Sequence, residues 1–436
     1  MSGATTPDMA GRQLAASTER TGEGAIAPVR RGERIESLDF IRGIAVMGIL
    51  AANIVAFGQP FQAYMYPDAF LTEHGPVSDW LLVAQFVIID SKMRGLFTLL
   101  FGAGLYLFME RTWARGGTRW RQIWRLFILL LFGLIHYYLI WAGDILLYYA
   151  VIGFLIVPCL KWGAEAQLLT GLIGFVFGAL LYSAMLTFPY LVAETSLGEQ
   201  AQFSEVREGT LEAQASALAD SNVETELIRS GDYAGVLSHR LSEHGADPIG
   251  NVLIFALETI PLMLLGVALY RLGFFGGGFP SRKMRLWGWT GLIIGALLNF
   301  GIGLFLMSTG FGYYAMLAAF VGWSSIPQLL MVLGLAALMV EYSDRWRGEL
   351  AERVRAAGRA AFTNYLGTSI LMLFVFQGWA LGLFGELSRP ELYLVTLLTC
   401  GLMLLWSKPW LERFRYGPLE WLWRCLTYGK VFPIRR

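Results

Sequence analysis

Runs of about 20 consecutive apolar residues recur along almost the whole of this 436-residue chain, and they constrain its fold more than any other feature. A helix of ~20 residues crosses the ~30 Å hydrocarbon core of a bilayer, and a backbone in lipid must satisfy its hydrogen bonds within the segment. The composition agrees, with 56% hydrophobic residues, 15% charged residues and a mean hydropathy of +0.52. These values exclude a disordered chain, a collagen-like chain and an ordinary soluble enzyme.

The apolar runs predict an all-α polytopic transmembrane bundle of about ten spans. The stretch 313–341 is longer than a span needs, and Pro327 within it predicts a kinked or tilted helix rather than two spans. The predicted spans cover residues 38–57, 93–110, 121–141, 144–161, 166–190, 250–271, 286–308, 313–341, 360–384 and 391–407.

Loops rich in Arg and Lys alternate with loops that are poor in them. Because basic loops stay in the cytoplasm, this alternation predicts that both termini are cytoplasmic. It divides the chain into a disordered cytoplasmic tail (1–36), five transmembrane helices (37–190), a periplasmic insertion (191–249), and five further helices with a cytoplasmic tail (250–436).

The insertion 191–249 carries eleven acidic residues against Arg207, Arg229 and Arg240. Its composition is compatible with short amphipathic helices that cap the bundle, and equally with a solvated loop. We find no internal repeat in the chain, so an inverted-repeat transporter gains no support from the sequence.

The global charge and the cysteines exclude several kinds of site. A net charge of +1 and a pI of 7.7 give no reason to expect nucleic acid as a partner. Cys159, Cys400 and Cys425 have no metal-like spacing, so we expect neither a disulfide framework nor a bound metal.

Ionisable residues inside a span are costly, and they are therefore candidates for function. Asp39 and Arg42 share a helical face at the start of the first span, where they form either a helix-anchoring ion pair or, through Arg42, a ligand for a cytosolic phosphate. Asn53 lies near the outer end of the same helix and either bonds a neighbouring span or belongs to the site.

A second group of charges lies at the outer ends of two spans. Lys92 and Arg94 follow Asp90 and serve either as headgroup anchors or as an anion site. Glu258 lies inside the sixth span, where it either stays protonated or pairs with Lys92, Arg94 or His136.

The segment GLIHYYLIWAGDILLYYA (133–150) holds the strongest candidate pair, His136 and Asp144. They flank an outer hairpin, so both lie near one membrane face. A histidine oriented by a carboxylate can act as a general base, whereas the alternative is a structural tie across the hairpin. Trp141 lies within the hairpin and is included in the candidate site.

Five segments together resemble a known family: LDFIRGIAVMGILAANIVAFGQP (38–60), LFTLLFGAGL (96–105), GLIHYYLIWAGDILLYYAVIGF (133–154), TNYL (363–366) and FRYGPLEWLWRCLTYGK (414–430). The family is the YeiB-like family of bacterial inner-membrane proteins, long labelled a domain of unknown function. The resemblance implies a multi-pass protein of the bacterial inner (plasma) membrane. It also implies a relation to transmembrane acyltransferases, partly through an LDxxRG-like start to the first helix.

The acyltransferase relatives move an acyl group from cytosolic acyl-CoA to an acceptor across the membrane with an intramembrane histidine. In the acyltransferase-3 family that histidine lies about eleven residues after the first-helix arginine, a position that Asn53 occupies here. The catalytic histidine therefore does not carry over by position. His136 is the substitute that the chemistry suggests.

The leading hypothesis is acyl transfer from acyl-CoA to a periplasmic envelope glycan or lipid. Arg42, Asn364 and Tyr365 would hold the donor, and His136 would take a proton from the acceptor while Asp144 orients its ring. Lys92 or Arg94 would steady developing negative charge.

The expected partners are the acyl donor, the acceptor and membrane lipids, with a homo-oligomer left open and no metal or nucleic acid. The alternative is a transporter or lipid translocator that uses the same polar residues. An assembly scaffold is a weaker third hypothesis.

Overall fold

A computed structural model describes residues 35–72, 75–343 and 345–436, and within them it contains helices and no β-strand. The predicted all-α bundle is therefore confirmed for the described part of the chain. The tail predicted over 1–36 lies almost wholly outside the described residues.

Seven of the described helices are long and apolar enough to cross a membrane. The pair α14 (Glu349–Arg359) and α15 (Ala361–Phe376), bent by 83°, makes an eighth if it is counted as one span. The count of about ten spans and the cytoplasmic termini remain predictions. The seven are α2 (Glu36–Gly58), α5 with its π-helical end (Trp120–Ile140), α7 (Ala164–Glu194), α10 (Asp247–Arg271), α11 (Ser281–Ser308), α13 (Ser325–Ser343) and α16 (Arg389–Arg413).

Other helices complete the bundle and its two ends. They are α3 (Pro76–Ile88), α4 (Lys92–Trp113), α6 (Leu146–Cys159), α8 (Ser204–Ser230), α9 (Tyr233–Ser242), α12 (Tyr313–Ala318) and α17 (Pro418–Tyr428). Short 3₁₀ turns lie at Phe61–Tyr64, Pro67–Ala69, Ser196–Glu199, Ala201–Phe203 and Phe274–Gly276.

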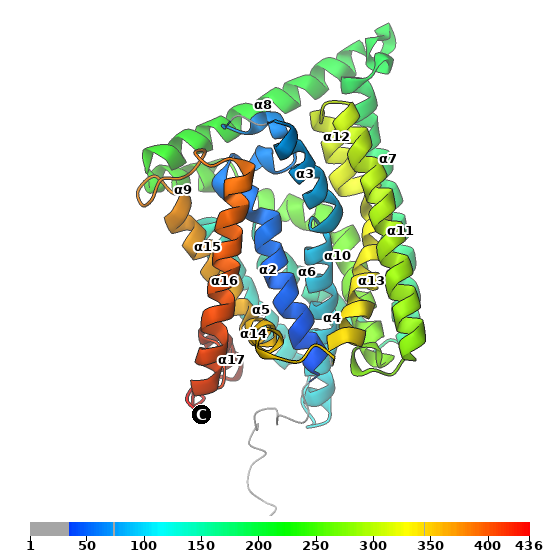
Figure 1. The fold of residues 1–436 in the computed structure, drawn as a ribbon, viewed down its shortest axis with the longest axis vertical. Helices are drawn as coiled ribbons and strands as arrows, with labels where there is room; N and C mark the ends of the chain where they lie inside the picture. The colour runs from blue at the N-terminus through cyan, green and yellow to red at the C-terminus, as the bar shows by residue number, and fades with distance from the viewer. Residues whose placement is uncertain (1–34, 73–74, 344) are drawn as a thin grey trace, which may run out of the picture. The chain divides into compact units, whose positions relative to one another are not determined.

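Helix α2 lies in the middle of the bundle and contacts α4, α13, α14, α15 and α16 (Figure 1). Within its most apolar stretch 67% of the residues are buried, compared with 22% in α7 and in α11. The apolar side chains that α7 and α11 expose suit contact with lipid, whereas α2 is an internal helix that positions the site.

The insertion is helical. Helix α8 runs across one end of the bundle, which we call the cap end (Figure 1). The Tyr314 hydroxyl donates to the carbonyl of Thr210 at 2.6 Å, and the Gly378 amide donates to the carbonyl of Ile228 at 3.0 Å. These bonds fix both halves of α8, so the segment is a cap and not a solvated loop. The opposite end, which carries α14 and α17, is called the basal end.

Three details differ from the sequence-based expectation. Helix α3 was not predicted, and α15 ends at Phe376 rather than near 384. The break expected at Pro327 lies earlier, in a π-helical turn over Ala319–Trp323 between α12 and α13. Pro327 itself lies in the first turn of α13, where the missing N–H of proline costs little.

Glycines allow two pairs of helices to touch through their backbones. A Cβ on Gly266 of α10 would lie 1.9 Å from the Leu99 carbonyl oxygen of α4, and one on Gly358 of α14 would lie 1.8 Å from the Asp39 carbonyl oxygen of α2. Since helices in lipid associate mainly by close packing, these contacts hold α4 and α14 against their neighbours.

The Gly266→Ala substitution tests this packing. The added methyl must push α10 from α4, and overpacking of this kind costs about 1–3 kcal/mol. We expect a lower unfolding temperature of the detergent-solubilised protein. Gly301→Ala in α11 is the matched control because nothing lies within 4 Å of its Cβ position. Equal stability of the two variants would contradict the packing argument.

Candidate functional site

The end of α5 and the start of α6 are joined through a buried His136–Asp144 pair. His136 Nδ1 lies 2.7 Å from Asp144 Oδ1, and both side chains are fully buried. The Leu147 amide donates to Asp144 Oδ2 at 2.6 Å, so the same carboxylate caps the first turn of α6. Both predicted partners therefore meet, as the hairpin suggested.

The orientation of the His136 ring follows from these bonds. Because Asp144 accepts at Nδ1, the neutral imidazole carries its proton on Nδ1 and leaves Nε2 as the basic nitrogen. His136 Nε2 is buried and has no hydrogen-bond partner within the described residues. Buried polar atoms are nearly always satisfied, so this one requires an explanation.

The local backbone places His136 at a helix irregularity. His136 begins a π-helical turn that ends at Ile140, and the Trp141 amide donates to the His136 carbonyl at 2.7 Å. Such π turns are frequent at functional sites. The turn ends α5 and starts the hairpin that returns the chain to Asp144.

Two aromatic rings surround the pair. The Tyr365 ring centroid lies 5.3 Å from that of His136, and the Tyr365 hydroxyl accepts from the Ile145 amide at 3.1 Å. Trp141 stacks on Phe57 with ring centroids 4.0 Å apart. Tyr365 therefore covers the pair on one side, whereas Trp141 is held against α2.

A cavity of about 200 Å³, which we call the arginine cavity, approaches the pair from the basal end. Arg42 of α2, Arg125 of α5 and Arg359 of α14 line it, together with Leu146 and Tyr365. Three guanidinium groups on one cavity suit a phosphorylated ligand, because the planar fork of arginine matches phosphate oxygens.

Contacts within the protein hold three of the charged groups of the arginine cavity in place. Arg42 donates to Asp39 at 3.2 Å, and the Arg125 guanidinium lies 4.4 Å from the Trp423 ring centroid. Glu420 also lines the cavity, but its carboxylate accepts from the Thr363 and Phe362 amides at the start of α15. Burial raises the pKa of the Glu420 carboxyl, while these hydrogen bonds favour its charged form.

A second cavity of about 270 Å³, the outer cavity, lies on the other side of the pair. Asn53, Arg94, Trp141 and Asp144 are among its lining residues. Next to it is the cap cavity, of about 310 Å³, which also has Trp141 in its wall and is covered by α8. Asp144 and Ile145 line the outer cavity and Leu146 lines the arginine cavity, so a short backbone segment with His136 and Tyr365 separates the two.

Lys92 and Arg94, predicted as one group of charges, have different partners in the structure. Arg94 pairs with Glu258 at 2.8 Å, one of the pairings foreseen, and Gln328 donates to the other oxygen of Glu258 at 3.0 Å. Lys92 is 1% exposed and donates to the Phe86 carbonyl. Lys92 therefore holds backbone inside the bundle and does not line the outer cavity, which agrees with neither alternative, the headgroup anchor or the anion site.

Asn364 is also placed differently from the expectation. Its side chain donates to the Ala357 carbonyl and to the Ser407 hydroxyl, and it accepts from Trp406 Nε1. These bonds tie α14, α15 and α16 together away from the arginine cavity. Of the predicted donor residues, the structure brings Arg42 and Tyr365 to one cavity and leaves Asn364 in a packing role.

The sequence interpretation missed Arg125, Arg359 and Glu420. The two arginines belong to the basic clusters next to predicted spans, where the positive-inside rule already explains them, and Glu420 lies beyond the last predicted span. For Arg359 and Glu420 a signal is present in the amphipathic patterns of α14 and α17, because the polar face of such a helix lies at a cavity or at the membrane surface.

Comparison with known proteins places the chain among relatives without an assigned activity. Residues 269–430 match a family model described as "Protein of unknown function (DUF418)". The chain is 34% identical over 418 residues to the uncharacterized protein YeiB of Escherichia coli (strain K12), covering 92% of this chain and 98% of that relative. The chain belongs to the YeiB-like family. It is also 30% identical over 436 residues to the uncharacterized protein YxaH of Bacillus subtilis (strain 168), covering 94% and 98%.

No solved structure matches this YeiB-like chain. The two relatives cover nearly its full length, including the His136–Asp144 hairpin. With its apolar helices, the chain is a membrane protein with bacterial relatives.

The contribution of the Arg94–Glu258 pair can be tested by measuring the stability of protein variants that lack one or both charges. Glu258→Gln leaves Arg94 without its counter-charge, and we expect the free energy of unfolding to fall by ~1–3 kcal/mol. The Arg94→Gln/Glu258→Gln double variant should lose less than the sum of the single losses. Glu349→Gln is the control, since its pair with Lys408 lies at the protein surface, where water and salt weaken an ion pair, and we expect it to cost less stability than Glu258→Gln. Additive losses in thermal unfolding would show that the two residues do not interact.

Proposed function

We propose that this YeiB-like protein is a transmembrane acyltransferase of the bacterial inner membrane. It would move an acyl group from cytosolic acyl-CoA to a hydroxyl or amine of a periplasmic envelope glycan or lipid. The observation that carries the proposal is the buried, unpartnered Nε2 of His136 beside Asp144, between a cationic cavity at one end and the outer cavity at the other.

The proposed proton transfers follow from the His136 tautomer that carries its proton on Nδ1 and leaves Nε2 basic. The hydroxyl oxygen or amine nitrogen of the acceptor forms a bond to the thioester carbonyl carbon, and His136 Nε2 takes the proton that this atom loses. The carbon–sulfur bond breaks, and the imidazolium returns the proton to the coenzyme A thiolate. Asp144 keeps the ring oriented and stabilises its positive charge, as the carboxylate does in a catalytic triad.

In this proposal the two substrates bind at opposite ends, and the charge distribution supports that arrangement. The phosphates of acyl-CoA suit the arginine cavity, which the topology prediction places on the cytoplasmic side. The acyl end would then reach past Leu146 and Tyr365 toward His136. The acceptor would enter from the cap end, where the outer cavity presents Asn53, Trp141 and Arg94.

The side chains that separate the two cavities must move before the donor and the acceptor can meet. His136 is fully buried, so donor and acceptor must displace the rings that cover it. Tyr365 is the side chain placed to move, because it lines the arginine cavity and also contacts the His136 ring. Opening of this contact would join the two cavities at the basic nitrogen.

The general base is tested by His136→Asn and His136→Gln, which keep an amide near Asp144 and remove the basic nitrogen. Acyl transfer to envelope acceptors should fall ~10²–10⁴-fold. The readout is mass spectrometry of envelope lipids and glycans from cells that express each variant in place of the native protein. Tyr138→Phe is a control in the same turn. Normal acylation by both His136 variants, at equal protein levels, would refute the role.

Donor binding is tested at the arginine cavity. Removing a charge-assisted hydrogen bond costs ~1.5–3 kcal/mol, so Arg42→Gln or Arg359→Gln should weaken acyl-CoA binding by about ten- to 150-fold. Binding is measured by calorimetry on purified protein. Asp39→Asn is the matched control, because it breaks the ion pair and keeps the guanidinium. Equal affinity of Arg42→Gln and the native protein would leave Arg42 as the structural partner of Asp39.

A further inference from the structure

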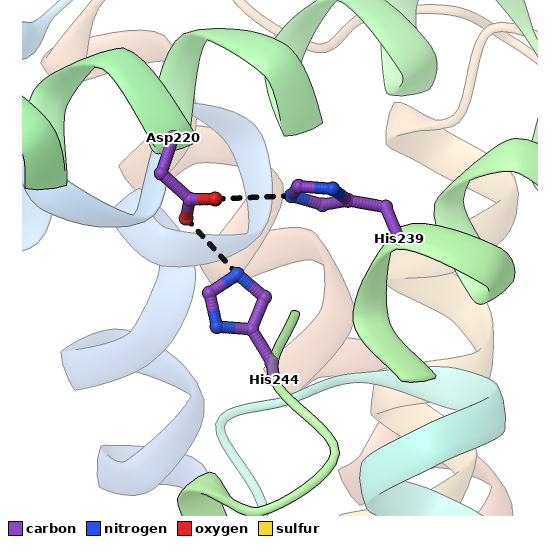
Figure 2. A group of neighbouring side chains, drawn as sticks. All are labelled: Asp220, His239 and His244. Atoms are coloured by element: carbon purple, nitrogen blue, oxygen red, sulfur yellow. Dashed lines mark ion pairs between the residues drawn. The ribbon is translucent and has the colours of Figure 1, made fainter. Parts of the chain in front are cut away.

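Two histidines and an aspartate meet in the cap, far along the chain from the His136–Asp144 pair. Asp220 comes from α8, His239 from α9, and His244 from the connection between α9 and α10 (Figure 2). His239 Nε2 lies 3.2 Å from Asp220 Oδ1, and His244 Nε2 lies 3.0 Å from Asp220 Oδ2. The three ligand atoms all lie within 4.8 Å of one another.

We propose that these three side chains form a binding site for a divalent transition-metal ion of the zinc class. Zn²⁺ binds histidine nitrogen and carboxylate oxygen at ~2.0–2.2 Å, so neighbouring ligand atoms of a tetrahedral site are separated by about 3.3 Å. If Asp220 ligates through one oxygen, that oxygen lies 3.2 Å from His239 Nε2 or 3.0 Å from His244 Nε2, close to this separation. Ligation by two imidazoles disfavours Ca²⁺ and Mg²⁺, which prefer oxygen.

The contacts are not those of satisfied hydrogen bonds. His239 Nε2 is buried and has no hydrogen-bond partner among the described residues, although the Asp220 carboxylate is close. In the tautomer with the proton on Nδ1, the Nε2 lone pair is available to an ion bound by the three side chains. Within the described residues Asp220 pairs with these two imidazoles, so a cation would also balance its charge.

A carboxylate behind one ligand strengthens the assignment. His244 Nδ1 lies 2.9 Å from Asp247 Oδ2, on the side of the ring away from Asp220. Such a carboxylate behind a metal-binding histidine fixes the tautomer that leaves Nε2 free to ligate. With His244 held in this way, both of its ring nitrogens have a role.

Three protein ligands leave one position of a tetrahedral ion open. Asp220 and His244 both line the cap cavity, so a water molecule or a ligand in that cavity has access to the ion. The ion would also tie α8 to the α9–α10 connection. This inference does not depend on acyl transfer, because it concerns a different set of residues.

The experiment uses the full-length protein in detergent, with its purification tag removed, stripped of metal and then loaded with Zn²⁺ or Co²⁺. We expect one bound ion per chain, and for Co²⁺ the intense visible absorption of tetrahedral coordination. His244→Gln and Asp220→Asn should abolish this binding, and Asp247→Asn should weaken it ~10–100-fold. Glu226→Gln, an exposed carboxylate on the same helix, should leave it unchanged.

Two results would overturn the proposal. One is native protein that retains no stoichiometric ion after loading, and the other is equal binding by the native protein and both ligand variants. If a ligand variant fails to fold, the Co²⁺ spectrum of the native protein decides, since an octahedral or absent spectrum excludes the site.

Discussion

The Asp144 carboxylate holds together the segment that separates the arginine cavity from the outer cavity. One oxygen accepts from His136 and the other accepts from the Leu147 amide, so a single group ends α5, begins α6 and orients the imidazole. In a medium of low dielectric, a carboxylate satisfied on both oxygens is stable, whereas an unpaired one is very costly. The wall between the arginine cavity and the outer cavity is therefore fixed by the residues that the proposed chemistry uses.

Burial alone does not distinguish functional charges from structural ones in this protein. Lys92 and Asn364 are as deeply buried as His136, but their hydrogen-bonding groups are occupied by neighbouring backbone and side chains. His136 differs because one nitrogen is occupied and the other is not. An unsatisfied buried group is expensive, and a site that binds a substrate there recovers that cost when the substrate arrives.

The sequence predicted the helices and the pair across the hairpin because both depend on local pattern. Apolar run length reports a membrane helix, and a short turn brings the His136 and Asp144 side chains together. The arginine cavity was not predictable in this way, since it requires the 83° bend between α14 and α15 to bring Arg359 beside Arg42. His239 and His244 lie in the insertion, outside the predicted spans, so a search for ionisable residues inside the membrane does not reach them.

The position of Glu258 bears on the choice between an enzyme and a transporter. A proton relay through the bundle would need His136, Asp144 and Glu258 to exchange protons in turn. Both oxygens of Glu258 are engaged, one by Arg94 and the other by Gln328, so it is held as a fixed counter-charge. Of these three groups, His136 therefore remains as the proposed base. The arginine cavity, with three arginines, lies on one side of it, and the outer cavity, with one arginine and several aromatic rings, lies on the other. Such an asymmetric arrangement suits a reaction between two different substrates better than the passage of one substrate through both ends.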